Sequence, residues 1–215
     1  MNPKKVKMKK IIPSIIAKNQ KEFDECFEKI KSLSPVFHLD VMDGKFVRNK
    51  SLLFDLTLPR AKYHIHLMVH NPEKYIEIIH SKAETIIFHL ESVIKKEGVE
   101  RVIKLIKKKK KKVWIALSPK TRSREVEPFL DSIDGVLIMT VAPGKYGERF
   151  LSRSLIKVKE IRSLNEEIDI CVDGGINDKT IKKAVKVGAN LFVVGSYLQD
   201  AEDVKKTVKE LGGKL

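Results

Sequence analysis

Short apolar runs rich in β-branched residues recur eight times along this 215-residue chain, and stretches with helical spacing separate them. This alternation predicts parallel βαβ units. The expected strands span residues 11–16, 36–41, 63–68, 85–90, 113–117, 135–141, 168–172 and 191–194. Eight strands with eight crossovers close into a (β/α)8 barrel, the α/β fold known as the TIM barrel, with an open doubly wound sheet as the alternative.

Helical patterns occupy most of the intervals, at 22–33, 72–80, 93–108, 155–164, 178–187 and 201–211. Pro72 and Asp178 stand where helix N-termini are expected, and Gly188 stands where a helix should stop. The intervals after the second and fifth strands are weakly patterned. The length suits one sizeable core, so we expect a single barrel domain over residues 1–215.

The chain carries a formal net charge of +15, with much of the excess at 1–10 and in the lysine run 107–112. A solvated lysine surface is the simplest interpretation. A positive field that attracts an anionic substrate is the second, and nucleic-acid binding is the third. Because aromatics do not interleave the lysines and no nucleic-acid module is recognisable, nucleic acid is not an expected partner.

The composition and the two cysteines indicate the cellular compartment that we expect for this protein. With 42% hydrophobic and 33% charged residues, the chain is typical of a soluble globular protein. Cys26 and Cys171 lack the close spacing of a metal or redox motif, so we expect two buried thiols. The apolar stretch 11–17 is short and contains Pro13, which argues against a signal peptide or a membrane span. We expect a cytoplasmic protein without a membrane partner.

Glycines and residues with polar or sulfur-bearing side chains occur where the expected strands end, which is where active sites lie in this barrel. These residues are Ser14, His38, Asp40, Met42, His66, Met68, His89, Met139, Asp173, Gly174, Gly175, Gly195 and Ser196. A ring of functional side chains is therefore expected at the carboxyl ends of the strands.

A metal site is the first chemistry that this ring suggests. His38 and Asp40 are two apart on one strand, so their side chains share a face, and His66 on the next strand can join them. Two histidines with one or two carboxylates suit Zn, Fe(II), Mn or Co and leave room for substrate oxygens. The alternative is that these histidines are hydrogen-bonded structural residues.

Asp40 and Asp173 suggest acid/base chemistry, because they belong to the second and seventh strands and are expected to face one another across the barrel mouth. A base on one face of a carbon next to a carbonyl and an acid on the other face would invert that carbon. A divalent ion at the carbonyl and neighbouring hydroxyl would stabilise the enediolate between the two steps. The alternative is that Asp173 only forms a turn with the glycines after it.

Small residues after the last two strands indicate a phosphate. Gly174, Gly175, Gly195 and Ser196 stand where such barrels commonly bind phosphate through backbone N–H groups. The loop 143–147 could close over the ligand, and Lys145 would add a positive charge. A phosphorylated ligand is predicted, with plain tight turns as the alternative.

Longer motifs point to a family. HLDVMDGKFVRN at 38–49 and HLMVHNP at 66–72 are followed in order by MTVAPG at 139–144, VDGGI at 172–176 and VGS at 194–196. In order and spacing these motifs resemble the ribulose-phosphate 3-epimerase family over nearly the whole chain. The resemblance implies a (β/α)8 barrel of the ribulose-phosphate-binding type that interconverts D-ribulose 5-phosphate and D-xylulose 5-phosphate in the pentose phosphate pathway.

The resemblance also implies the residues of the site. His38, Asp40, His66 and Asp173 would hold one divalent metal ion, zinc first, with Fe(II), Mn or Co as alternatives, and Asp40 and Asp173 would be the acid/base pair. The phosphorylated ketose would be contacted by Ser14, Met42, His66, Met68, Met139, Gly144, Gly147, Gly174, Gly175, Gly195 and Ser196. His89 would play a supporting part. We also expect a homo-oligomer.

Several positions depart from the family's usual residues. The family usually has Pro at Arg48, Asn at Ser118 and Ala142, Phe-Gly at Lys145-Tyr146 and Gln at Glu148, and the segment 16–19 lacks the usual Ser-Ala-Asp. These changes spare the expected metal and acid/base residues and alter the lid. Two alternatives therefore stay open: 3-epimerisation of a six-carbon ketose phosphate such as D-allulose 6-phosphate, and a non-catalytic barrel that binds sugar phosphate or nucleic acid.

Overall fold

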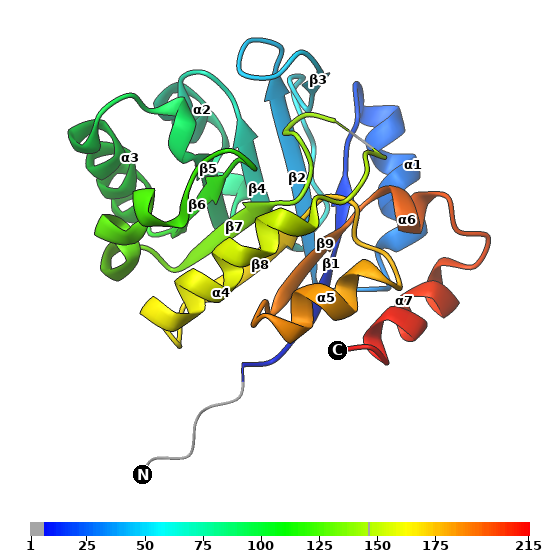
Figure 1. Cartoon of the computed structure of the whole chain (residues 1–215). Coiled ribbons are helices and arrows are strands. Elements are labelled where there is room, and N and C mark those ends of the chain that lie inside the picture. The colour runs from blue at the N-terminus through cyan, green and yellow to red at the C-terminus, as the bar shows by residue number, and fades with distance from the viewer. Residues whose placement is uncertain (1–6, 146) are drawn as a thin grey trace.

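Eight parallel strands form a closed barrel in the computed structural model, which describes residues 7–145 and 147–215 (Figure 1). The strands are β1 (Lys10–Ile15), β2 (Val36–Asp43), β4 (Lys62–Met68), β5 (Thr85–His89), β6 (Lys112–Leu117), β7 (Gly135–Met139), β8 (Asp169–Asp173) and β9 (Leu191–Val194). β1 pairs with β2 on one side and with β9 on the other. The sheet therefore closes into the predicted (β/α)8 barrel, and the doubly wound alternative is wrong.

The alternation of side chains along the strands separates the barrel interior from its helix-covered outside. On β2 and β4, odd-numbered residues such as Leu39 and Leu67 pack in the apolar layer between strands and helices. Even-numbered residues take the opposite face. The register of the two strands places Asp40 beside His66 and Met42 beside Met68. Polar and sulfur-bearing side chains are thereby aligned at the carboxyl ends inside the barrel.

Helices surround the barrel, as Figure 1 shows. They are α1 (Gln20–Ile30), α2 (Pro72–Ile79), α3 (Lys96–Lys108), α4 (Leu155–Leu164), α5 (Thr180–Lys186), α6 (Ser196–Gln199) and α7 (Val204–Gly212). Pro72 is the first residue of α2, and Gly188, at φ +103°, follows the end of α5 as predicted. Asp178 lies two residues before the first residue of α5, close to the expected start. The side chain of Asn177 accepts hydrogen bonds from the N–H groups of Lys179 and Thr180 just before and at the start of the helix.

Two crossovers lack an α-helix, and they are the two weakly patterned intervals for which no helix is predicted. After β2 the chain forms β3 (Lys50–Ser51), which pairs antiparallel with the end of β2. After β6 it forms two short 3-10 segments, η3 (Ser123–Glu125) and η4 (Glu127–Ser132). The interval after β6 is short and contains Pro119 and Pro128, which disfavour a continuous helix.

The outer apolar layer supplies much of the stability. Phe88 on β5 is 0% exposed within that layer, and we expect Phe88→Ala to lower the free energy of unfolding by about 3–5 kcal/mol because the truncation leaves a cavity. Chemical denaturation followed by circular dichroism measures the change. Ile78→Ala on α2, where the side chain is 64% exposed, is the control and should cost less than about 0.5 kcal/mol. Equal losses in the two variants would contradict this packing.

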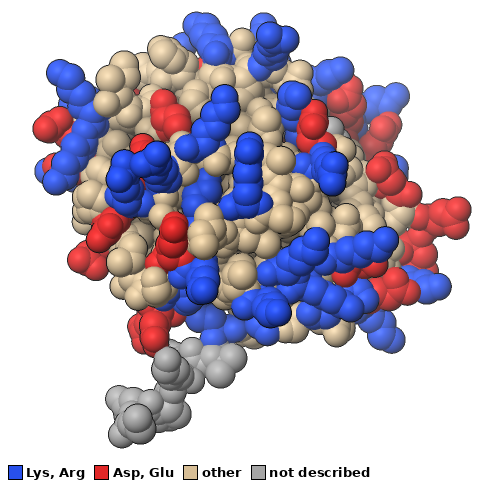
Figure 2. Space-filling view, viewed as in Figure 1, with Lys and Arg blue, Asp and Glu red and all other residues tan. Residues whose placement is uncertain are grey.

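The lysine run 107–112 lies on the surface at the end of α3 and the start of β6. Lys109 Nζ lies 2.6 Å from Glu77, and Lys112 Nζ lies 3.4 Å from Glu84. Figure 2 shows basic side chains spread over one face of the molecule, with acidic side chains between them. This arrangement agrees with a solvated lysine surface. The basic segment 1–6 lies outside the described residues.

Two smaller expectations can be compared with the structure. Over residues 7–145 and 147–215, every helix is too short or too polar to cross a membrane. Both cysteines are free thiols, but only Cys171 is buried, whereas Cys26 on α1 is half-buried. The expectation of two buried thiols is therefore right for Cys171 alone.

Candidate metal and acid/base site

Four side chains converge at the carboxyl ends of the strands. His38, Asp40, His66 and Asp173 each offer one ligand atom, and these atoms all lie within 4.8 Å of one another. His38 Nε2 is 3.3 Å from Asp40 Oδ1 and 3.7 Å from Asp173 Oδ2. His66 Nδ1 is 3.1 Å from Asp40 Oδ1 and 3.6 Å from Asp173 Oδ2. Both histidines are fully buried, and the two carboxylates are nearly so.

The fold explains why these residues meet. His38 and Asp40 share the inner face of β2, and the β2–β4 register sets His66 beside Asp40. Asp173 ends β8, which is separated from β2 by β1 and β9 in the closed sheet. Because the barrel curves, residues separated by two strands lie on different sides of the same small space. The two carboxylates thus reach the histidines from different directions.

The electrostatics of the cluster favour positive charge among the four groups. Burial lowers the pKa of His66, but the carboxylates of Asp173 and Asp40 outweigh it and raise the pKa to about 9. Burial raises the pKa of Asp40, yet His38 and His66 outweigh it and hold that pKa below its usual value. Asp40 therefore stays ionised, and the two carboxylates favour a positive charge on or beside the histidines.

The donor set fits a divalent metal ion. Two imidazole nitrogens and two carboxylate oxygens at one point are the ligands that zinc and the neighbouring transition metals accept. Two carboxylates that face the same pair of histidines in a buried space require a positive charge between them, which a bound cation can supply. The buried His/Asp cluster is therefore consistent with a divalent metal site, whereas the geometry alone does not select one metal.

A pocket opens above the cluster at the mouth of the barrel. It is lined by the sequence-predicted residues Ser14, Asp40, Met42, Met68, Met139, Gly144, Gly147, Asp173, Gly174, Gly175, Gly195 and Ser196, together with Lys145 and Glu148. His38 and His66 do not line this pocket, because they lie beneath it. His89 lies beside His66, with their Nε2 atoms 3.0 Å apart. The structure thus brings the predicted ring together around one cavity.

The corner after β8 is shaped by close backbone packing. Gly174 has φ +104°, and a Cβ there would lie 2.4 Å from Val141 Cγ2. Thr140 holds the corner, because its hydroxyl donates to the carbonyls of Asp173 at 2.8 Å and Gly174 at 2.6 Å. Only glycine fits at position 174. The backbone therefore turns sharply after Asp173 and leaves the carboxylate of Asp173 at the mouth.

This chain matches the family model described as the ribulose-phosphate 3 epimerase family over residues 10–199. The chain belongs to that family. The ribulose-phosphate 3-epimerase of Schizosaccharomyces pombe is 34% identical, covering 94% of this chain and 92% of the relative. That of Bacillus subtilis is 33% identical, covering 96% of this chain and 99% of the relative.

Solved structures share the family's barrel. The crystal structure of 3-hexulose-6-phosphate synthase from Salmonella typhimurium superimposes with a TM-score of 0.69 and covers 97% of this chain and 98% of its own. Its sequence identity is 14%, so this likeness shows the fold alone. Together with the family match, it confirms the fold that the sequence motifs predicted.

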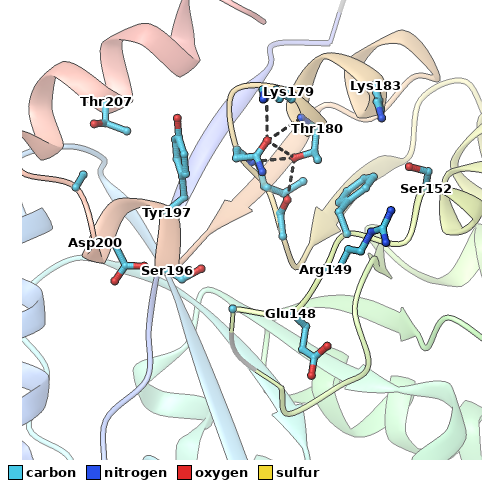
Figure 3. A pocket seen from close by; sticks show the side chains of 16 residues that line it. Glu148, Arg149, Ser152, Lys179, Thr180, Lys183, Ser196, Tyr197, Asp200 and Thr207 are labelled. Carbon is cyan, nitrogen blue, oxygen red and sulfur yellow. Dashed lines mark hydrogen bonds between the residues drawn. The ribbon is translucent and has the colours of Figure 1, made fainter.

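A second hollow of about 680 Å³ adjoins the mouth (Figure 3). It shares Gly147, Glu148, Gly175, Ile176 and Ser196 with the mouth pocket. Figure 3 shows Tyr197 and Asp200 on one side of it and Arg149 and Lys183 on the other. The cavity therefore continues beyond the glycines at the expected phosphate end of the family's site. Tyr146, one of the departures in the lid, lies outside the described residues.

Some residues around the site were missed in the sequence. Asp43 was given no role of its own within the motif at 38–49, but its carboxylate accepts hydrogen bonds of 2.8 Å from the N–H groups of Lys45, Phe46 and His70. It thus joins the loops after β2 and β4. Its position at the end of a strand of the HLDVMDG motif was the available signal. Glu91 was also missed, although it stands two residues after His89.

Proposed function

We propose that this protein is a metal-dependent 3-epimerase that interconverts D-ribulose 5-phosphate and D-xylulose 5-phosphate by two-base proton transfer. One observation carries the proposal: Asp40 and Asp173, from strands with two others between them, present carboxylate oxygens to the same pair of buried histidines. Family relatives about one-third identical bear the name ribulose-phosphate 3-epimerase, which supports the five-carbon substrate.

His38, Asp40, His66 and Asp173 would hold the metal, zinc first, with Fe(II), Mn or Co as alternatives. When bound, the ion supplies positive charge that stabilises the oxygens of the enediolate formed from the substrate. The raised pKa of His66 and the lowered pKa of Asp40 indicate that the cluster favours a positive charge at this place.

The two carboxylates would move the protons. One carboxylate removes the C3 proton from one face of the substrate and becomes a carboxylic acid. The other is protonated beforehand, delivers its proton to the opposite face and becomes a carboxylate. C3 is inverted, and each group ends in the protonation state that the reverse reaction requires. Asp40 and Asp173 suit these roles because both line the mouth pocket.

Three methionines would keep this proton transfer free of competing acids. Met42, Met68 and Met139 line the pocket and are only 2–3% exposed. Their thioethers neither donate protons nor hydrate strongly, so they surround the reacting carbon with apolar surface. Water is thereby excluded from the enediolate, and the electrostatic interactions of the site are strengthened.

The glycine-rich side of the pocket would bind the substrate's phosphate. Backbone N–H groups around Gly144, Gly147, Gly174, Gly175 and Gly195 are accessible because these residues lack side chains. Ser196 adds a hydroxyl, and Ser14 stands on the neighbouring strand β1. A phosphate placed here would leave the sugar carbons directed toward the carboxylates.

Lys145 gives a prediction about substrate binding. Its Nζ is 3.0 Å from Glu148 Oε1, so the positive charge expected at the lid is paired in the structure. Because exposed ion pairs are weak, Lys145 can turn to a phosphate, and Lys145→Ala should raise KM by about fivefold with little change in kcat. Glu148→Gln, which frees the lysine, should lower KM. Steady-state kinetics measure both, and an unchanged KM in both variants would place Lys145 away from the substrate.

The decisive assay is conversion of D-ribulose 5-phosphate by the purified protein with added Zn, Fe(II), Mn or Co and a chelated control. Metal-dependent formation of D-xylulose 5-phosphate is expected. Absence of turnover with every metal would reject the proposed substrate.

A six-carbon ketose phosphate such as D-allulose 6-phosphate is the second candidate, favoured by the hollow of about 680 Å³ that continues from the mouth pocket. This space gives a longer sugar phosphate room beyond Gly175 and Ser196. Comparison of kcat/KM on the two sugar phosphates separates the candidates. A higher value for the six-carbon sugar would make it the substrate of the same 3-epimerisation.

A further inference from the structure

A hydrogen-bonded chain runs from the cluster to the surface. His66 Nε2 lies 3.0 Å from His89 Nε2, and His89 Nδ1 lies 2.9 Å from Glu91 Oε2. His66 and His89 are 0% exposed, whereas the Glu91 side chain is 26% exposed. The two rings stack with their centroids 5.0 Å apart. These hydrogen bonds therefore link His66, a residue of the cluster, to the carboxylate of Glu91, which lies outside the cluster.

The direction of each hydrogen bond follows from counting protons. An ionised carboxylate only accepts, so His89 Nδ1–H donates to Glu91. In a neutral imidazole the other nitrogen is then bare, so His89 Nε2 accepts from His66 Nε2–H. His66 Nδ1 faces His38 Nε2 at 3.3 Å and Asp40 Oδ1 at 3.1 Å, so a metal ion that displaces the proton favoured there by the carboxylates would meet the lone pair of Nδ1. This is the atom that a metal in the cluster requires.

Glu91 is itself held in place as an acceptor. Its Oε1 accepts a 2.8 Å hydrogen bond from the N–H of Ser118 and another from the hydroxyl of Thr121. Lys157 Nζ donates to the carbonyls of Ser118 and Thr121 at 2.6 and 3.0 Å, which holds the same loop. Burial raises the pKa of Glu91, but its hydrogen bonds outweigh burial and lower the pKa to about 2. Glu91 is therefore ionised at neutral pH.

We infer that Glu91 is a positioning residue for metal binding, acting through His89 to hold a proton on Nε2 of His66 and to direct Nδ1 into the cluster. The inference rests on the metal site of the proposed function and adds a residue that the acid/base chemistry does not use. Carboxylates that orient a metal-bound histidine are known to influence metal affinity. Here one more histidine lies between the carboxylate and the ligand.

The substitution Glu91→Gln tests the direction of the chain. The Ser118 N–H can only donate, so the glutamine must place its oxygen there and its NH₂ group toward His89 Nδ1. His89 would then donate from Nε2 to His66 Nε2, and the proton of His66 would move to Nδ1, where it blocks the metal. We expect the Kd for Co²⁺ to rise by about 10- to 100-fold.

Glu91→Ala distinguishes this role from a merely structural one, because a structural role predicts weaker Co²⁺ binding in Glu91→Ala than in Glu91→Gln. It removes the acceptor without presenting an NH₂ group, and water can reach the vacated position because the side chain is 26% exposed. The conservative variant Glu91→Gln should therefore bind Co²⁺ more weakly than Glu91→Ala. Glu97→Gln on the exposed surface of α3 is the matched control and should bind like the unaltered protein.

Co²⁺ titration of the metal-free protein, with the visible absorption of bound cobalt as the signal, measures these affinities without any assay of turnover. Adding His89→Phe tests the route, because Glu91→Gln should cause no further loss in that background. A Kd for Glu91→Gln within twofold of that of Glu97→Gln would overturn the inference. If the unaltered protein did not bind Co²⁺ either, the metal site of the proposed function would be wrong as well.

Discussion

Asp173→Asn and Asp40→Asn are each expected to lower kcat by about 10³-fold or more while the barrel stays folded. The amide keeps the size of the carboxylate and an oxygen ligand, but it can neither take nor return a proton at neutral pH. Both residues line the mouth pocket beside the same two histidines, so each is placed to serve one face of the substrate. Steady-state kinetics with metal content measured on the same samples check this expectation.

Isotope exchange distinguishes proton transfer from a general loss of activity. In D₂O, a variant that keeps one base should still exchange the C3 hydrogen of one epimer, although it no longer interconverts the two. Asp40→Asn and Asp173→Asn should therefore exchange opposite epimers. Asp131→Asn, on the exposed side of η4, is the control and should retain turnover. Exchange of the same epimer by both variants would refute the assignment of one carboxylate to each face.

Metal removal is expected to abolish turnover reversibly and to lower the thermal stability. A metal bound to the folded state alone stabilises that state by about 4 kcal/mol at 1,000 times its Kd. For a chain of this size that corresponds to a fall in Tm of about 8–16 °C on chelation. Differential scanning calorimetry of the chelated and metal-loaded protein measures the shift, and turnover should return with added Zn²⁺ or Co²⁺.

Histidine variants test whether the metal-dependent change in Tm arises at the His/Asp cluster. His38→Ala removes a fully buried side chain of the cluster, so the variant should show little increase of Tm when metal is added. His70→Ala, with an exposed side chain in the loop after β4, should behave like the unaltered protein. An equal metal-dependent shift in both variants would show that the metal binds elsewhere.

Much of the barrel could be predicted from local patterns, and the strand boundaries agree within two residues. Parallel strands buried on both sides are short continuous apolar runs, and helices with one buried face have a distinct spacing, so their alternation is visible in the sequence. The two intervals with weak patterns, after β2 and β6, are those without an α-helix. The short α6 was also missed, because four residues show no periodicity.

Within the site, the residue types were predictable and their partners were less so. Lys145 was expected to add a positive charge at the lid, and the structure pairs that charge with Glu148, three residues further along the same loop. Asp178 was expected at the start of a helix, but α5 starts at Thr180, and the side chain that accepts from the N–H groups there is that of Asn177. Both differences depend on the local path of the chain, which residue types alone do not specify.

The sequence by itself determined the barrel, the family and the inward face of each strand, because a period of two assigns His38 and Asp40 to one side wherever the strand lies. Only the tertiary structure decided how these residues are joined. Closure through β1 brings Asp173 to His38 and His66, and the loop after β6 holds Glu91 through Ser118 and Thr121. These contacts depend on strand register and ring closure, so they join residues far apart in the chain through distances that no local pattern encodes.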